Sequence, residues 1–198
     1  MNMRQRNALL TKEKIYNAAI SLFEEKGYEN TSIEDITTLA GTAKGSFYTY
    51  YKSKNDLVYH TVEVFNEVAI NSYEEASTCD TFEKQLLKFI ELLYKGVEDV
   101  GKEILKALYR NNIVDASTQV VNDMERDIYT SVAKIVDYGL KTGELSDKNS
   151  RDFYLRKIII PIMGIDYYWC CSEEKIEIVE LATSEIKVLL DGLMAVGK

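Results

Sequence analysis

The residues best suited to chemistry in this sequence are donors of hydrogen bonds gathered near its N-terminal end. Residues 36–55 contain no aspartate or glutamate, although the chain as a whole is acidic. Hydroxyl groups and ammonium groups bind phosphate, whereas a carboxylate in the same place would repel it. The composition therefore indicates contact with a polyanion, and the candidate residues are Thr31, Ser32, Lys44, Gly45, Ser46, Tyr48, Thr49, Tyr50 and Lys54.

Three helices, of which the second and third are short, are predicted to position these residues. Apolar residues at helical spacing predict a first helix over about 11–26, with Gly27 at its C-terminal end (Ile15, Ala18, Ala19, Leu22, Phe23). The Thr31–Glu34 segment fits a capping box and predicts a second helix over 32–40. Gly41 suits a tight corner, and Thr42 would cap a third helix ending near Tyr50. Two short helices joined by such a corner form a helix-turn-helix.

Gly45 is unusual because it stands inside the predicted third helix. Glycine there costs about 1 kcal/mol relative to alanine. Close approach of the backbone to base edges in the major groove would explain it, and tight packing against the first helix is the structural alternative. Phe47 and Tyr51 are expected to fill the core of the three helices.

Composition and the distribution of charge bear on the fold class and on where a polyanion could bind. The chain has 198 residues, 46% of them hydrophobic, one proline and ten glycines, which favours an all-helical protein. The formal charge is -8, but residues 1–60 hold eight basic and seven acidic side chains, against 16 and 25 in the remainder. Only the N-terminal end would therefore tolerate phosphate.

Other residues argue against catalysis and secretion. The single histidine, His60, cannot build a metal triad or a Ser-His relay, so we expect no metal, no cofactor and no enzyme activity. Three cysteines, two of them adjacent, do not form a secreted disulfide framework, and no charged-then-apolar leader opens the chain. The longest apolar run has eight residues and contains Pro161, too short for a membrane span. A cytoplasmic protein is expected.

Longer helices are predicted beyond residue 53, over about 53–75, 81–97, 102–110 and 118–141, the last ending at Gly143. The final two helices carry apolar residues three and four apart, typical of antiparallel helix packing. We predict that this seam forms the interface of a homodimer, with packing within one chain as the alternative (Ile158, Ile162, Ile165, Trp169; Val179, Ala182, Ile186, Leu189, Leu193).

Residues 15–57 resemble the DNA-binding domain of the tetracycline-repressor-type (TetR) regulators. In that family a G-Y/F-x-x-T-T segment opens the second helix, here residues 27–32, and an A-G-V-S-x-G-x-x-Y-x-Y/H-F-x-x-K segment forms the recognition helix, here residues 40–54. The resemblance implies phosphate contacts by Ser32, Tyr48 and Lys54. It implies a groove-facing set of Thr42, Lys44, Gly45, Ser46 and Thr49. Thr37, Thr42 and Ala43 depart from the family pattern, and Ala43 puts one contact in doubt.

The same resemblance implies a pocket for a small molecule in the larger part of the chain. The residues expected to line it are Phe65, Phe89, Leu93, Tyr109, Tyr129 and Asp166. Its many tyrosines would suit a flat, apolar or cationic ligand. Packing with the hydroxyl at the surface is the alternative for each tyrosine, and an exposed or satisfied carboxylate is the alternative for Asp166. Cys170 and Cys171 are interpreted as packing residues rather than redox sensors.

We therefore expect an all-α protein of about nine helices. Residues 1–53 would form a helix-turn-helix DNA-binding domain, and residues 54–198 an effector-binding and dimerisation domain. The expected function is a homodimeric transcriptional regulator, a repressor that a small-molecule effector releases from a near-palindromic operator. A helical protein-interaction module and a helical enzyme using Asp166 or Cys171 are the alternatives.

Overall fold

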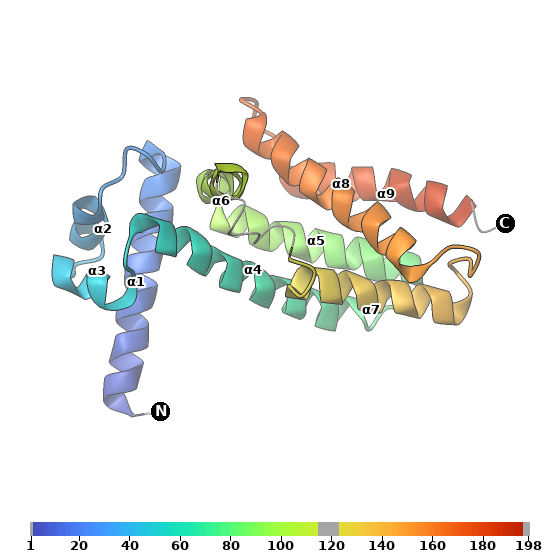
Figure 1. Cartoon of the computed structure of the whole chain (residues 1–198), viewed down its shortest axis with the longest axis horizontal. Coiled ribbons are helices and arrows are strands. Elements are labelled where there is room, and N and C mark those ends of the chain that lie inside the picture. Colours follow the sequence, from blue (N-terminus) through green and yellow to red (C-terminus); the bar gives the residue numbers. More distant parts are fainter. Residues whose placement is uncertain (1, 115–122, 196–198) are drawn as a thin grey trace. The chain divides into compact units, whose positions relative to one another are not determined.

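A computed structural model describes residues 2–114 and 123–195, and within these ranges all regular structure is helical (Figure 1). The prediction of an all-α protein is confirmed. The elements are α1 (Met3–Lys26), α2 (Ile33–Leu39), α3 (Lys44–Tyr50), α4 (Lys54–Ala76), α5 (Phe82–Val100), α6 (Lys102–Val114), α7 (Asp127–Thr142), α8 (Arg151–Cys171) and α9 (Ile178–Ala195).

The chain divides into two compact units. Of the described residues, the N-terminal unit comprises 2–62 and 100–114, and the C-terminal unit comprises 63–99 and 123–195. Helix α4 passes from the first unit into the second, and α6 belongs to the N-terminal unit although it follows α5 in sequence. The predicted functional division after residue 53 stays a prediction.

In the N-terminal unit, α1 packs against α2, α3 and α6 through its C-terminal half. The predicted stripe is buried, and Ile36, Phe47, Tyr51 and Leu57 complete the core. The helix begins at Met3 rather than near residue 11, because Asn2 and Gln5 form a capping box. The Asn2 side chain accepts a hydrogen bond from the Gln5 backbone N–H, and the Gln5 side chain accepts one from the Asn2 backbone N–H.

The capping of α2 and α3 differs from the prediction. Ser32, not Thr31, is the N-cap of α2, and Asp35 rather than Glu34 completes the capping box. The N-cap of α3 is Ala43, whose side chain offers no hydrogen bond, so Thr42 does not cap that helix. Gly41, with φ 64°, makes the corner between the two helices as expected.

Helix α6 is held against α1 by polar contacts. The Glu24 carboxylate accepts a hydrogen bond from the backbone N–H of Glu103 at 2.5 Å, close to Gly101, whose φ is 100°. Arg110 forms an ion pair with Glu29 in the loop after α1. These bonds explain why a helix distant in sequence belongs to the N-terminal unit.

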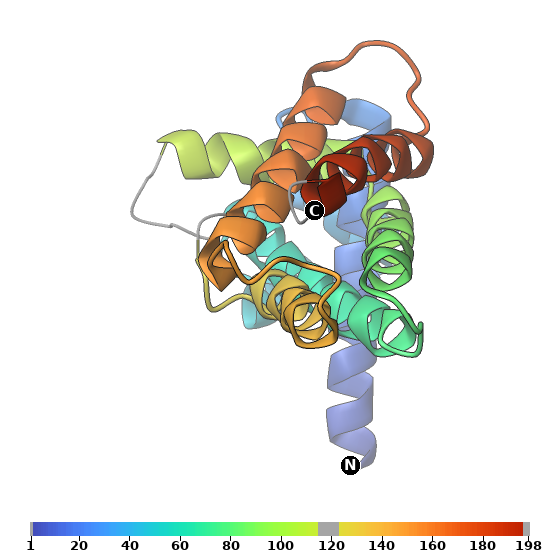
Figure 2. The same ribbon diagram turned by 90° about the vertical axis from the view of Figure 1, so that its right-hand side faces the viewer.

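The C-terminal unit is built around α8, which packs on α7 and on α9 (Figure 2). The buried Tyr94 hydroxyl of α5 donates a hydrogen bond to the Ile162 carbonyl of α8 at 3.0 Å, next to Pro161. Helix α7 begins at Asp127 rather than near residue 118, and Met124 lies in the turn before it. Residues 115–122, part of the predicted helix, lie outside the described residues. Gly143 ends α7 in the left-handed conformation, as predicted.

The described residues contain neither a membrane-spanning helix nor a cluster of metal-ligating side chains. Among the helices within residues 2–114 and 123–195, none has the length and apolar character needed to span a bilayer. In the same ranges, no three side chains of the types that ligate metals come together.

Candidate nucleic-acid interface

The corner between α2 and α3 presents one side of α3 outward. Phe47 and Tyr51 are buried and fix the helix on the core of the N-terminal unit. The side chains of Lys44, Tyr48 and Thr49 are exposed together with Gly45, and we call these four residues the α3 front. Thr42, Ser46 and Tyr50 flank them and are half-buried. The fold therefore brings together seven of the ten predicted DNA-binding residues.

Gly45 faces open space. A Cβ atom at this position would meet no described atom within 4 Å, and the backbone is not in the left-handed region. Neither packing against α1 nor backbone strain requires glycine here. A close approach to a partner outside the protein is the explanation that is left.

Thr42 carries an unsatisfied polar atom beside the α3 front. Its hydroxyl oxygen is buried and has no hydrogen-bond partner among the described residues. A buried polar group without a partner costs about 1–3 kcal/mol. A rotation of this side chain toward a bound phosphate or base would recover that cost.

Thr31 and Lys54 do not belong to the exposed set. Thr31 is buried, and its hydroxyl donates to the carbonyls of Gly27 at 2.9 Å and Leu22 at 3.2 Å. The Lys54 ammonium donates to backbone carbonyls at 2.6 Å (Tyr28), 2.9 Å (Thr31) and 3.5 Å (Glu29). An ammonium group has three donors, so none is left for a phosphate. Both residues hold the loop between α1 and α2.

Burial also changes the electrostatics of this loop. The pKa of Lys54 is lowered, mainly by burial, and its ammonium lies 4.3 Å from the centroid of the Tyr28 ring. Burial raises the pKa of Tyr28 to about 12. Both pKa shifts are caused mainly by burial, as expected if Lys54 and Tyr28 hold the loop in place.

The acid-free stretch of sequence is not acid-free in space. Glu34 of α2 places its carboxylate 3.9 Å from the Lys44 ammonium, and Asp35 lies 4.0 Å from Lys26. Both pairs are exposed, and such pairs contribute about 0–1 kcal/mol. Lys44 is therefore easily released to a phosphate. The Ser32 hydroxyl is exposed on the same side and donates to Asp35 at 2.6 Å.

The predicted dimer seam is covered within one chain. Seven of its nine side chains are buried between α8, α9 and their neighbours (Ile158, Ile162, Ile165, Trp169, Ala182, Ile186, Leu193). Val179 and Leu189 are half-buried. This burial agrees with the alternative of packing within one chain, and the seam as a dimer interface stays a prediction.

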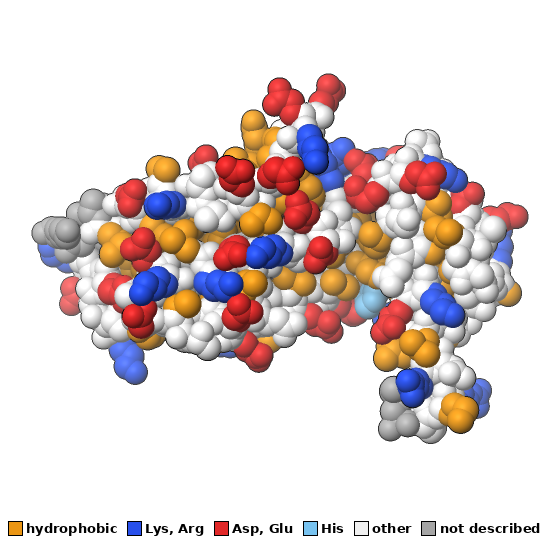
Figure 3. Space-filling view, turned by 180° about the vertical axis from the view of Figure 1, so that it is seen from behind, with side chains coloured by type: hydrophobic (Ala, Val, Ile, Leu, Met, Phe, Trp, Pro, Cys, Tyr) orange, Lys and Arg blue, Asp and Glu red, His pale blue; other side chains and the backbone are white. Residues whose placement is uncertain are grey.

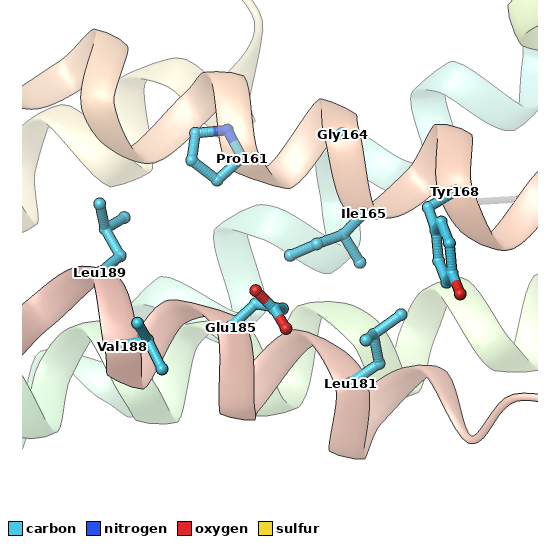
Figure 4. A pocket seen from close by; sticks show the side chains of 8 residues that line it. All are labelled: Pro161, Gly164, Ile165, Tyr168, Leu181, Glu185, Val188 and Leu189. Carbon is cyan, nitrogen blue, oxygen red and sulfur yellow. The ribbon is translucent and has the colours of Figure 1, made fainter.

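The opposite side of the same two helices is apolar and open. A groove of about 580 Å³ lies between α8 and α9, and its lining side chains are drawn in Figure 4 (Pro161, Gly164, Ile165, Tyr168, Leu181, Glu185, Val188, Leu189). Val188 is 70% exposed and Tyr168 57% exposed. We call this surface the outer face of α8 and α9. Two of its lining residues, Ile165 and Leu189, belong to the predicted dimer seam, and the apolar residues Leu181 and Val188 lie beside them.

The predicted effector residues are scattered. Phe65, Phe89, Leu93 and Tyr129 are buried and Asp166 is half-buried, all in the C-terminal unit, whereas Tyr109 lies on α6 of the N-terminal unit. Tyr129 lines a cleft of about 190 Å³, and the five others do not. Its other lining residues are Met124, Leu155, Arg156, Ile159, Ile160 and Met163. On α8 the sequence analysis named only Asp166 as a pocket residue, and the spacing of apolar residues did not show which of the others face this cleft.

Comparison with known proteins supports the interpretation of the corner. The sequence model of the family described as "Bacterial regulatory proteins, tetR family" matches residues 15–60. The uncharacterized HTH-type transcriptional regulator YvdT of Bacillus subtilis is 25% identical over 90% of this chain and 92% of its own length. The biofilm operon icaADBC HTH-type negative transcriptional regulator IcaR of Staphylococcus epidermidis is 32% identical over 40% of this chain and 45% of its own.

A solved structure extends the likeness to the whole fold. The transcriptional regulator FadR from Bacillus subtilis, in complex with stearoyl-CoA, superimposes with a TM-score of 0.69 at 20% identity. The match covers 91% of this chain and 98% of that one. Both units of the chain therefore have the fold found in these regulators.

Proposed function

Because the chain belongs to the TetR family of bacterial regulatory proteins, we propose that it is a repressor that leaves its operator when a small molecule binds. It would act as a homodimer on a near-palindromic site in the cytoplasm. The observation that carries this proposal is the α3 front, an exposed set of donors around a glycine that nothing in the fold requires.

The proposed DNA contacts follow from exposure, since the Ser32 and Thr49 hydroxyls are accessible although they donate within the fold, to Asp35 at 2.6 Å and to the Gly45 carbonyl at 3.1 Å. Ser32 and Tyr48 would bind phosphate, and the remaining residues would face base edges in the major groove (Thr42, Lys44, Gly45, Ser46, Thr49, Tyr50). Thr31 and Lys54 are left out because their donors are used inside the fold.

The outer face of α8 and α9 would hold the second copy. An interface with two-fold symmetry uses the same patch on both chains, and exposed apolar side chains suit such a patch. The dimer would place two recognition helices about 34–36 Å apart, or at a multiple of that spacing.

A signal between the two units would travel along the chain through α4 or α6. Helix α4 crosses from one unit to the other, and α6 is bonded to α1 while both its ends continue into the C-terminal unit. An effector that binds one arrangement of the units better than another would shift the spacing of the recognition helices. A coupling of about 1–3 kcal/mol would change operator occupancy about 5- to 150-fold.

The cleft beside Tyr129 is the proposed effector entrance. Its lining is apolar apart from Arg156, which suits an apolar molecule carrying an anionic group. The cleft is smaller than the roughly 300 Å³ of typical ligand pockets, so a ligand would have to widen it. Stearoyl-CoA, the ligand of the solved FadR, is the first probe.

The test begins with selection of a binding site from random duplex DNA by the purified chain. With about three or four phosphate contacts per subunit, log affinity should fall with log salt at a slope of about -5 to -7. Stearoyl-CoA should then weaken binding, and the Met163→Trp variant, which fills the cleft, should reduce that response. A chain that selects no site, or binds with a flat salt response, would overturn the proposal.

A further inference from the structure

We propose that residues 2–12, the projecting start of α1, form a second DNA contact that lies on the operator flanks outside the helix-turn-helix. This inference rests on the proposed function. It assigns a role to a segment that the core of the N-terminal unit does not use.

The segment is helical but does not pack. The first buried residue of α1 is Ile15, and most side chains of residues 2–10 are exposed. At 1.5 Å per residue, the helix extends about 18 Å from Met3 to Ile15. Figure 1 shows it running past α2 and α3 of its own unit. The Asn2–Gln5 capping box and propagation from the packed half stabilise the projecting turns without tertiary contacts.

Its charge is opposite to that of the chain as a whole. Residues 2–12 contain Arg4, Arg6 and Lys12 and no carboxylate, in a protein of formal charge -8. None of these three side chains has an ion-pair partner among the described residues. Figure 3 shows the projection at the lower right, where cationic and hydrophobic side chains gather.

The base of the projection lies beside the recognition helix. The Lys12 ammonium is 5.8 Å from the centroid of the Tyr51 ring, and Tyr51 is the C-cap of α3. A duplex that meets the α3 front therefore passes within reach of a rod about 18 Å long that begins at the end of the same helix. At 3.4 Å per base pair, such a rod spans about five base pairs of flanking DNA.

DNA fits this segment better than a second protein copy does. The segment exposes only three large apolar side chains, Met3, Leu9 and Leu10, which is few for an interface with a second copy, since such interfaces take about 20–30 residues a side. Arg4 and Arg6 have no acidic residue beside them in the sequence, the first carboxylate of α1 being that of Glu13, and they match the spaced phosphates of a duplex. Arginine in particular binds phosphate with two parallel hydrogen bonds.

The experiment compares two duplexes that contain the selected binding site. The inner duplex ends at the palindrome, and the extended duplex continues for eight base pairs on each side. Binding of the full chain is measured as a function of salt for the wild type and for the Arg4→Gln/Arg6→Gln variant. The control is Lys148→Gln/Lys175→Gln, which removes two exposed cations from the C-terminal unit.

On the extended duplex, the arginine variant should lose up to four phosphate contacts per dimer. Its salt slope should become shallower by about 2 to 4, at about 0.9 per contact. On the inner duplex, the wild type and the variant should bind alike, and the control should match the wild type on both. Circular dichroism should show unchanged unfolding, since the substituted side chains are exposed.

Three results would overturn the inference. The slope of the arginine variant could equal that of the wild type on the extended duplex. The salt slope of the arginine variant could become shallower by the same amount on the inner duplex. The slope of the lysine control could become shallower by as much as that of the arginine variant. If the wild type binds DNA in any of these cases, the proposed repressor function stands while the flank contact fails. If the wild type does not bind DNA, the flank contact and the proposed repressor function both fail.

Discussion

Two exposed surfaces of this molecule differ in chemistry in a way that separates their partners. The α3 front offers the hydroxyl groups of a tyrosine and a threonine, an ammonium group and a glycine. The outer face of α8 and α9 offers an apolar groove with a single carboxylate, Glu185. The first surface suits a hydrated polyanion, and the second suits burial against another protein.

The comparison also shows why exposure has to be known before a role is assigned. The α3 front and the structural pair Thr31 and Lys54 have similar side chains and are close in sequence, yet only the first is exposed. On α8 and α9 the buried seam and the outer face are both apolar, yet only the second is open. Residue type therefore selects candidates, and the fold selects among them.

The largest expected effect comes from a charge on the outer face. Val188→Asp would bury two unpaired carboxylates at a two-fold interface, each at a cost of several kcal/mol. The dissociation constant of the dimer should rise by about 1000-fold or more, and operator binding should be lost with it. Sedimentation should show a folded monomer. The control Ser184→Asp, at an exposed position of α9, should stay dimeric, and a dimeric Val188→Asp protein would contradict the assignment.

A carboxylate on the α3 front should abolish binding without changing assembly. Thr49→Glu places a negative charge against phosphate, which costs several kcal/mol, or at least about 100-fold in operator affinity. Asn71→Glu, an exposed position of α4 in the C-terminal unit, is the matched control and should bind normally. Equal losses in both variants would mean that net charge, not the surface, decides affinity.

Lys54 should matter for stability rather than for DNA. Lys54→Met leaves three backbone carbonyls without their donor, and we expect the free energy of unfolding to fall by about 1.5 kcal/mol. The salt slope of operator binding should not change. Urea unfolding compared with Lys52→Met, an exposed neighbour, tests this. A shallower salt slope for Lys54→Met would return the residue to the phosphate contacts.

Ser32 should show a smaller effect. Ser32→Ala removes the side-chain cap of α2 and should lower the free energy of unfolding by about 1 kcal/mol. Ser21→Ala, at an exposed position within α1, should stay within about 0.5 kcal/mol of the wild type. Thermal unfolding of both variants provides the measurement, and equal midpoints would argue against the capping role.

The smallest effect is a dependence on pH at the same cap. Hydrogen bonds from the Ser32 hydroxyl, and then from its backbone N–H, lower the pKa of Asp35 from its ordinary value of 3.8. The resulting stabilisation is complete above that value and is lost as the pH falls through the lower pKa of the folded state. Asp35→Asn should therefore flatten the acid side of the stability profile. An unchanged profile would show that the carboxylate contributes nothing there.

The sequence by itself determined the class of fold and the helix-turn-helix. Helical spacing of apolar residues, Gly27, Gly41 and Gly143 are local signals, because each depends on residues within a few positions of one another. The same holds for the acid-free stretch that marks the α3 front. Errors of local interpretation concerned the ends of helices, such as a capping box displaced by one residue and the starts of α1 and α7.

Only the tertiary structure decided which of two similar residues is buried and which helices share a unit. Contacts between residues far apart in the sequence decide that Thr31 is buried while Ser32 is exposed. They also decide which apolar residues of α8 and α9 are covered, and that α6 is bonded to α1. The free energy of such contacts comes from surfaces that exist only once the helices have packed. No periodicity along the chain encodes which neighbour covers a given side chain.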